Sequence, residues 1–179
     1  MNDAIERQRR EAVRKESFLI VARGRNGVIG AEGRIPWRQK ADMRHFRNAT
    51  LGSCLIVGRT TFDGLPPAMP GRTLVVLTSR PLPAGVDAIA ASSFAEAVEA
   101  ALQSGSRAIG FAGGPRIYEE AMALPWLGRA MITEIDDEPE GDSIMPTLDA
   151  SWTETIRTVL PATDGEPGAV MIGMTRETS

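Results

Sequence analysis

The stretch Ile35–Phe46 carries the residues best suited to binding chemistry. Within it, Asp42 and Phe46 are four residues apart, so in a helix their side chains project from the same face. A carboxylate can accept hydrogen bonds from two adjacent N–H donors, and a phenyl ring can stack on a flat partner. The pair therefore suits a planar heterocycle with an amidine-like edge. Taken alone, Asp42 has a simpler interpretation, as an acidic residue that favours a helix N-terminus.

Three further stretches combine glycines, hydroxyls and arginines, and each follows an apolar run of strand length. They are Gly58-Arg59-Thr60-Thr61, Thr78-Ser79-Arg80 and Gly113-Gly114-Pro115-Arg116-Ile117-Tyr118. Helix N-termini bind anions, arginines pair with phosphates, and glycines let the backbone approach a pyrophosphate. One such turn is weak evidence, but three of them predict a dinucleotide bound across the C-terminal edge of a sheet. Arg72, in a further turn, is either surface charge or a clamp for a carboxylate.

Glycines at positions 24, 27 and 30 follow the first apolar run and faintly suggest a dinucleotide fingerprint. That fingerprint must lead directly into a helix. Here the chain continues through Gly30, Gly33 and Pro36, all of which are poor residues for a helix interior. The segment Arg23–Arg34 is therefore predicted to be a mobile loop that lies over a site.

Composition excludes several classes of chemistry. The chain of 179 residues has 20 basic and 23 acidic side chains, a formal net charge of -3, one cysteine and one histidine. The balanced charge argues against a nucleic-acid or anionic-membrane partner, and no apolar run approaches the length of a membrane span. Cys54 and His45 are too few for a disulfide framework or a Cys/His zinc site, so no metal is expected. We expect a cytoplasmic protein of one domain.

The elements that must position these residues alternate along the chain. Short apolar runs predict buried parallel strands, and the periodicity of 94–103, with a capping box at Ser93 and Glu96, predicts a helix. Further expected elements are helices over 42–50 and 116–123, and strands over 18–22, 54–57, 74–77, 108–112 and 130–135. The segments 152–160 and 169–175 predict a closing antiparallel pair. Residues 1–16 are polar and read as a flexible extension or frayed helix ahead of a domain over 17–179.

Taken together, the motifs resemble those of dihydrofolate reductase. They run in order as Val28-Ile29-Gly30, Ile35-Pro36-Trp37, Asp42, Phe46, Gly58-Arg59-Thr60-Thr61, Pro70-Gly71-Arg72, Thr78-Ser79-Arg80, Gly113-Gly114, Ile117-Tyr118, Ile132-Thr133 and Glu140-Gly141-Asp142. The resemblance implies a single α/β domain with a central, mainly parallel eight-stranded sheet, helices on both faces and an antiparallel C-terminal edge hairpin. It also implies NADPH-dependent reduction of 7,8-dihydrofolate to tetrahydrofolate, which serves one-carbon metabolism.

The resemblance supplies roles for individual positions. The implied catalytic group is Asp42, which would bind the pterin edge, with Thr133 as its hydrogen-bonded partner and Trp37 holding an ordered water. The implied substrate contacts are Ile20, Ala22, Asp42, Met43, Phe46, Leu65, Arg72, Ala112, Tyr118 and Thr133. The implied cofactor contacts are Ala22, Ile29, Gly30, Gly58, Arg59, Thr60, Thr61, Thr78, Ser79, Arg80, Gly113, Gly114, Arg116, Ile117 and Tyr118. The two glycines at 113 and 114 resemble a cis Gly-Gly turn under the pyrophosphate.

Several positions depart from the family pattern, although none removes a catalytic group. Ala112 is smaller than the usual aliphatic residue, Pro115 lacks an N–H donor, Phe62 stands where tryptophan is common, and Met145 fills the place of a phenylalanine. Arg23 follows Ala22 where an aliphatic residue is common, and the sequence offers no reason for it.

Two alternative functions stay open at the level of the sequence. One is a riboflavin-pathway reductase that acts on a ribosylated aminopyrimidine with NADPH, although the block from Pro36 to Phe46 is not expected there. The other is a non-catalytic folate- or nucleotide-binding protein, which would need a broken constellation of Trp37, Asp42 and Thr133. The expected partners are dihydrofolate and antifolate inhibitors, and the expected state is a monomer.

Overall fold

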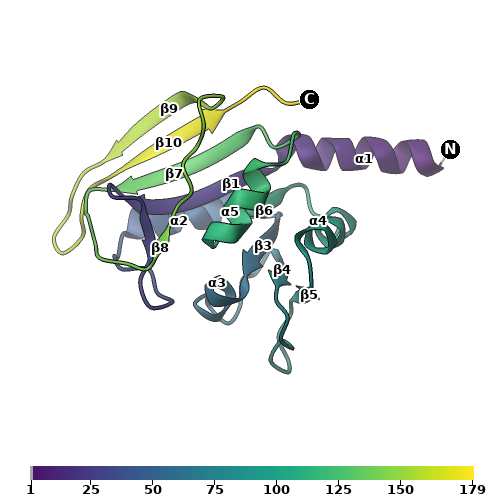
Figure 1. The fold of residues 1–179 in the computed structure, drawn as a ribbon, viewed down its shortest axis with the longest axis horizontal. Helices are drawn as coiled ribbons and strands as arrows, with labels where there is room; N and C mark the ends of the chain where they lie inside the picture. The colour runs from purple at the N-terminus through teal and green to yellow at the C-terminus, as the bar shows by residue number, and fades with distance from the viewer. Residues whose placement is uncertain (1) are drawn as a thin grey trace.

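The apolar runs form the centre of a parallel β-sheet in a computed structural model that describes residues 2–179 (Figure 1). Its strands include β1 (Phe18–Gly24), β3 (Cys54–Gly58), β4 (Thr73–Leu77), β5 (Ile89–Ala91) and β6 (Ile109–Phe111). Eight strands lie in the order β5-β4-β3-β6-β1-β7-β10-β9. Every pair from β5 to β7 is parallel, so the carboxyl ends of these strands meet at one edge. The parallel sheet expected from the short apolar runs is confirmed.

The other end of the sheet is the expected antiparallel hairpin. β7 (Arg129–Ile135) pairs with β10 (Ala169–Thr175), and β10 pairs with the edge strand β9 (Thr153–Leu160). The pairing of β1 with β7 places Arg23 directly opposite Glu134, and the two side chains form an ion pair of 3.1 Å. This cross-strand pair accounts for the unexpected arginine.

Helices cover both faces of the sheet. α2 (Lys40–Thr50) covers one face, where Phe46 packs against a small cluster that includes Phe18 and Ile20. α4 (Phe94–Gln103) and α5 (Pro115–Met122) contribute to the main core on the other face. The short helix α3 (Arg59–Asp63) directly follows β3. Odd and even residues of β1 therefore serve different layers, as strand alternation requires.

The predicted capping box of α4 is correct in one half only. The hydroxyl of Ser93 accepts a hydrogen bond from the Glu96 amide at 3.1 Å. The Glu96 carboxylate does not return to Ser93, and instead accepts from the Ser92 amide at 2.8 Å and the Ser92 hydroxyl at 2.6 Å. The carboxylate thus satisfies a donor one residue further from the helix.

The segment Arg23–Arg34 contains more regular structure than the predicted loop. β1 continues to Gly24, and β2 (Val28–Gly30) forms a separate antiparallel sheet with β8 (Ser143–Ile144). The loop prediction is wrong at these residues because strands of two or three residues leave no periodicity to detect. The small sheet joins the chain after β1 to the chain after β7.

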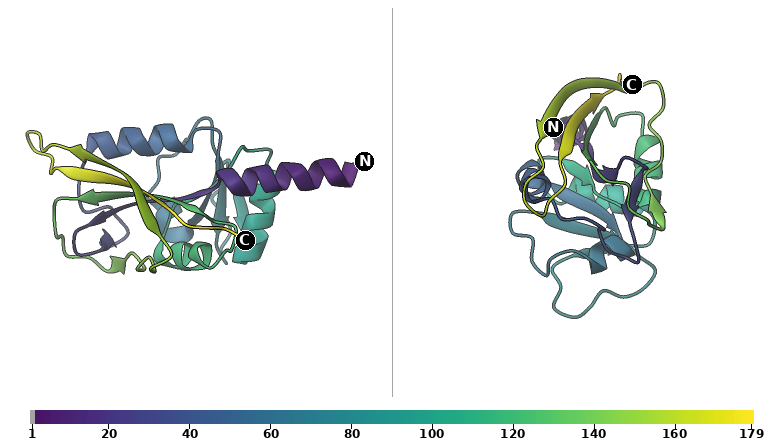
Figure 2. Two further views of the ribbon diagram at one scale, coloured as in Figure 1. Left: turned by 90° about the horizontal axis from the view of Figure 1, so that it is seen from above. Right: turned by 90° about the vertical axis from the view of Figure 1, so that its left-hand side faces the viewer.

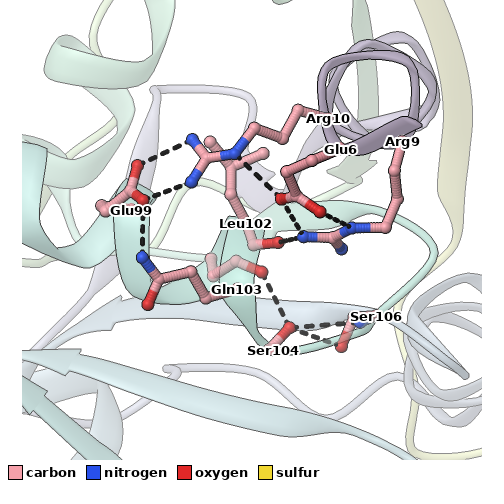
Figure 3. Close-up of polar contacts among 9 residues, drawn as sticks. Glu6, Arg9, Arg10, Glu99, Leu102, Gln103, Ser104 and Ser106 are labelled. Atoms are coloured by element: carbon pink, nitrogen blue, oxygen red, sulfur yellow. Dashed lines mark hydrogen bonds and ion pairs between the residues drawn. The ribbon is translucent and has the colours of Figure 1, made fainter. Parts of the chain in front are cut away.

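The N-terminal segment forms helix α1 (Asn2–Glu16), which projects from the end of the molecule away from β8 (Figures 1 and 2). On its side towards α4, Arg10 pairs with the Glu99 carboxylate, and Arg9 donates to a carbonyl of α4 at 2.7 Å (Figure 3). Val13 is buried in the main core. Of the two expectations for residues 1–16, a flexible extension or a frayed helix, the helix is present from Asn2, and its C-terminal half packs on the domain.

Candidate active site

The first turn of α2 places Asp42 beside the parallel strands. Gln39 is the N-cap residue, and its side chain accepts a hydrogen bond from the Ala41 amide at 2.7 Å. Asp42 follows in the first turn, and Phe46 lies one turn later on the same face. Phe46 is half-buried and packs, together with Ala112, against the cluster that contains Ile20. The predicted pairing of a carboxylate with an apolar wall is present.

Thr133 on β7 acts on the Asp42 carboxylate from the sheet. Thr133 is buried, and its register partner on β1 is Ala22. Burial raises the pKa of Asp42 above its ordinary value, because the charged form loses solvation, while the Thr133 hydroxyl and the charge of His45 oppose this rise. A cationic ligand bound beside this carboxyl would favour its charged form and lower its pKa.

Tyr118 connects α5 to the same strand. Its hydroxyl donates a hydrogen bond of 2.9 Å to the carbonyl oxygen of Ile20. Burial raises the pKa of Tyr118, and the negative charge of Asp42 raises it further. Tyr118 is therefore a neutral, fixed donor that lies within the electrostatic reach of Asp42, as expected of a residue between the two predicted ligand positions.

The carboxyl ends of β3 and β6 meet through their glycines. The Gly58 amide donates to the Gly113 carbonyl at 2.7 Å, and the peptide bond between Gly113 and Gly114 is cis, as the resemblance implied. Gly113 has a φ of +115°, and a Cβ atom there would lie 3.2 Å from the hydroxyls of Thr61 and Tyr118. Only glycine fits this position without displacing those hydroxyls, so the backbone itself forms the surface.

The turn after β4 is built around Thr78. Its hydroxyl accepts from the Arg80 amide at 3.1 Å and donates to the Arg80 carbonyl at 3.1 Å. Arg59, at the start of α3, extends towards the same turn and donates to the carbonyl of Pro81 at 3.0 Å. Arg59 also pairs with Asp63 at 2.9 Å. Arg59 therefore connects the predicted anion-binding turns after β3 and β4, and the hydrogen bond between Gly58 and Gly113 connects the turn after β3 with the third turn, after β6.

The third turn contributes through its backbone more than through its arginine. Arg116 pairs with Glu120 on the exposed side of α5 at 2.8 Å. Pro115 occupies the first helical position, where an N–H would have no intrahelical partner. Its missing donor therefore costs the helix nothing, although it removes one donor from the turn.

Arg72 lies at the other end of α2. Its guanidinium donates to the Thr50 hydroxyl at 3.4 Å and to the Pro70 carbonyl at 3.2 Å. Burial lowers the pKa of Arg72, and the nearby charge of Arg47 lowers it further. Within residues 2–179 no carboxylate pairs with either arginine, so this end of α2 presents two cations to an anionic group.

The remaining predicted residues are placed around these elements with fewer contacts. Trp37 and Leu65 are half-buried, Met43 is exposed, and Ile29 packs against the main core. The described hydrogen bonds do not connect Trp37 to Asp42. The other predicted cofactor contacts lie on elements already described: Gly30 ends β2, Thr60 is in α3, Ser79 is in the turn after β4, and Ile117 is a buried residue of α5.

Sequence reasoning missed two contributors to this region. Arg47 is close enough to Arg72 to lower its pKa, and its place in the last turn of α2, directly after Phe46, could have indicated it. Glu166 accepts a hydrogen bond from the Lys40 amide at 3.0 Å. Its separation of 126 residues from Lys40 leaves no local signal in the sequence.

The fold and these residues define an α/β protein with a carboxylate at a helix N-terminus and anion-suited turns at the sheet edge. A sequence model described as dihydrofolate reductase matches residues 17–171. The dihydrofolate reductase of Mycobacterium tuberculosis is 37% identical over 142 residues, which cover 75% of this chain and 82% of that protein. Dihydrofolate reductase type 3 of Salmonella typhimurium is 36% identical over 147 residues, with coverages of 82% and 88%.

A solved structure gives the same result in three dimensions. It is a dihydrofolate reductase from Enterococcus faecalis complexed with NADP(H) and RAB-propyl. It matches with a TM-score of 0.79 and 25% identity over 91% of this chain and 98% of that one. The chain belongs to the dihydrofolate reductase family. Helix α1 lies outside the residues that the family model matches.

Proposed function

We propose that this protein reduces 7,8-dihydrofolate to 5,6,7,8-tetrahydrofolate with NADPH, and so serves one-carbon metabolism. The observation that carries the proposal is the half-buried Asp42 carboxylate, which lies one helical turn before Phe46. The hydroxyl of Thr133, on the neighbouring sheet, lowers the pKa of this carboxyl against the larger rise that burial causes. The arrangement suits a flat, amidine-like edge. Membership of the dihydrofolate reductase family supports the same reaction.

The strand ends fit a phosphorylated dinucleotide. Gly113 leaves free the space that a Cβ would fill beside Thr61 and Tyr118, which allows a close approach to the backbone. Arg59 and Arg80 provide cations at the adjoining turns, as discrimination of a 2′-phosphate requires. When bound, NADPH supplies the hydride that is transferred to C6 of the pterin.

Asp42 orients the pterin in this mechanism. Its two oxygens accept hydrogen bonds from N3 and the 2-amino group, and its negative charge favours the protonated pterin. Among the described groups, no second carboxyl acts on the pKa of Asp42. We therefore assign the proton that reaches N5 to water rather than to a side chain.

The walls and the far end of α2 fix the rest of the substrate. Ile20, Phe46 and Ala112 form one apolar face, against which the ring and the benzoyl group pack. Arg72 pairs with the α-carboxylate of the glutamate, a role for which an arginine without a carboxylate partner is suited. Antifolates that mimic the pterin edge bind the same carboxylate. The residues proposed for the site all come from one chain, and we expect the protein to act as a monomer.

The test is a spectrophotometric assay of NADPH oxidation with dihydrofolate, followed by identification of tetrahydrofolate. We expect turnover with NADPH and much weaker turnover with NADH. Tight binding of methotrexate without turnover would instead indicate a non-catalytic folate-binding protein. Turnover only with a ribosylated aminopyrimidine would indicate the riboflavin-pathway type of reductase.

A further inference from the structure

The loop between β9 and β10 reaches the first turn of α2. The Glu166 carboxylate accepts a hydrogen bond from the Lys40 amide at 3.0 Å, and it lies 3.4 Å from the Lys40 ammonium group. The Gln39 side chain donates to the Pro167 carbonyl at 2.9 Å. Two adjacent residues of this loop therefore hold the two residues with which α2 begins.

The loop that carries Glu166 is braced by its own backbone. Thr163 and Glu166 exchange two backbone hydrogen bonds, of 3.0 and 3.2 Å, in a tight turn. Gly168 follows, and its carbonyl accepts from the Asp136 amide, directly beyond β7, at 2.8 Å. A carboxylate held by such a turn has a defined position relative to the sheet, because neither end of the turn is free to shift alone.

The Glu166 carboxylate contacts the backbone of α2, and little of the Glu166 side chain is exposed. The Glu166 side chain is only 9% exposed, whereas the Lys40 side chain is 62% exposed. The Lys40 backbone amide donates to Glu166, which lowers the pKa of that carboxyl below its ordinary value, and Lys40 and Arg38 supply positive charge. The contact with the backbone amide is therefore the stronger part of the interaction, since the exposed ammonium is screened.

These contacts satisfy two of the four donors that a helix leaves free at its N-terminus. The side chain of Gln39 accepts from the Ala41 amide, and Glu166 accepts from the Lys40 amide. Asp42 is the next residue in the same turn. The turn that carries Asp42 is therefore hydrogen-bonded to a residue 126 positions away in the sequence from Lys40.

We propose that Glu166 is a positioning residue for Asp42, which holds the first turn of α2 against the β9–β10 loop so that the carboxylate faces the substrate. This inference rests on the proposed dihydrofolate reduction. A displacement of this turn by a fraction of an ångström would weaken hydride transfer more than substrate binding, because transfer depends more steeply on orientation.

The experiment compares Glu166→Ala with Glu166→Gln, whose amide oxygen can still accept from the Lys40 amide. Asp164→Ala, at an exposed position of the same loop, is the matched control. We expect Glu166→Ala to lower the single-turnover rate of hydride transfer by about tenfold, with a smaller change in KM for dihydrofolate. Glu166→Gln should recover most of the rate, and Asp164→Ala should match the unaltered protein.

A second readout needs no ligand. If the first turn of α2 moves away from the sheet in Glu166→Ala, Asp42 becomes better solvated and its pKa should fall towards its ordinary value. Carboxyl NMR titration would measure this shift, with His45 on α2, Thr133 on β7 and Tyr118 on α5 unchanged around it. Amide hydrogen exchange at Lys40 and Ala41 should accelerate in parallel.

Unchanged hydride transfer and an unchanged Asp42 pKa in Glu166→Ala would overturn the proposal. Equal damage by Glu166→Gln would also overturn it, because the charge and not the hydrogen bond would then matter. Should Glu166→Ala fail to fold, Glu166→Asp, whose carboxylate is one methylene too short to reach Lys40, takes its place with the same expectations. If the unaltered protein has no reductase activity, the proposed function is refuted. The titration and exchange data would still show whether Glu166 holds the first turn of α2 in place.

Discussion

Asp42→Asn separates the chemical role of the carboxylate from its structural cost. Asparagine keeps the shape of the side chain but removes the charge and one of the two acceptor oxygens. A hydrogen bond to a charged group contributes about 1.5–3 kcal/mol and a neutral one about 0.5–1.5 kcal/mol. Because one bond is lost and the other keeps only a neutral acceptor, the substitution costs about 2.5–4.5 kcal/mol. At about 1.4 kcal/mol for each tenfold change in rate, kcat/KM should fall by about 10²- to 10³-fold.

The assay is single-turnover hydride transfer at neutral pH, with cofactor binding measured separately by fluorescence. Asp87→Asn is the control. Asp87 is exposed and lies outside α2, so this substitution removes the same charge away from the site. Cofactor affinity should be unchanged in both variants, since the anion-suited turns lie on other elements. A rate for Asp42→Asn within threefold of that of the unaltered protein would refute the assignment of Asp42.

The same substitution should have the opposite effect on stability. Burial raises the pKa of Asp42 above its ordinary value of 3.8, so the folded protein binds more protons than the unfolded chain in that window. Stability of the unaltered protein therefore falls as pH rises from about 3.8 through the raised pKa. Asp42→Asn lacks this loss, so its melting temperature relative to the unaltered protein should rise over that range and then level off. A constant difference at all pH values would contradict the burial argument.

Three other substitutions have specific outcomes. Gly113→Ala places a Cβ 3.2 Å from the Tyr118 hydroxyl at a φ of +115°, so thermal unfolding should show a loss of about 1–3 kcal/mol and NADPH affinity should fall. Arg72→Leu should raise KM for dihydrofolate by about 10- to 100-fold with kcat nearly unchanged, whereas a pteridine without the glutamate should be unaffected. Arg10→Ala removes the ion pair with Glu99, so amide exchange along α1 should accelerate while steady-state turnover stays the same; reduced turnover would link α1 to the site.

The parts of the fold that sequence could predict are those with strong local patterns. β3 and β4 are continuous apolar runs, and α4 has a complete apolar stripe, so both kinds of element were predictable from the pattern of apolar residues alone. β2 and β8 were not, because a strand of two or three residues depends on its partner rather than on its own residues. The packing of α1 was missed for a related reason, since Val13 is an isolated apolar residue in a polar helix.

The site shows the same division between local and distant information. The spacing of Asp42 and Phe46 is a property of one helix, and the structure brings both to the same face of the sheet. The start of α2 at Lys40, two residues before the predicted Asp42, could not be predicted from Gln39, which is not a favoured N-cap residue. The first amide of that helix donates to Glu166, a contact that exists only after β9 and β10 have joined the sheet.

Helix α1 is a suitable place to attach a label or a linker to this protein. It lies outside the matched family domain and projects from the end opposite β8 (Figure 2). A fluorophore or a surface linker attached to its outer turns would stand clear of α2 and the strand ends that hold the site. Such a conjugate could report on ligand binding in immobilised or single-molecule formats without obstructing the approach of small molecules.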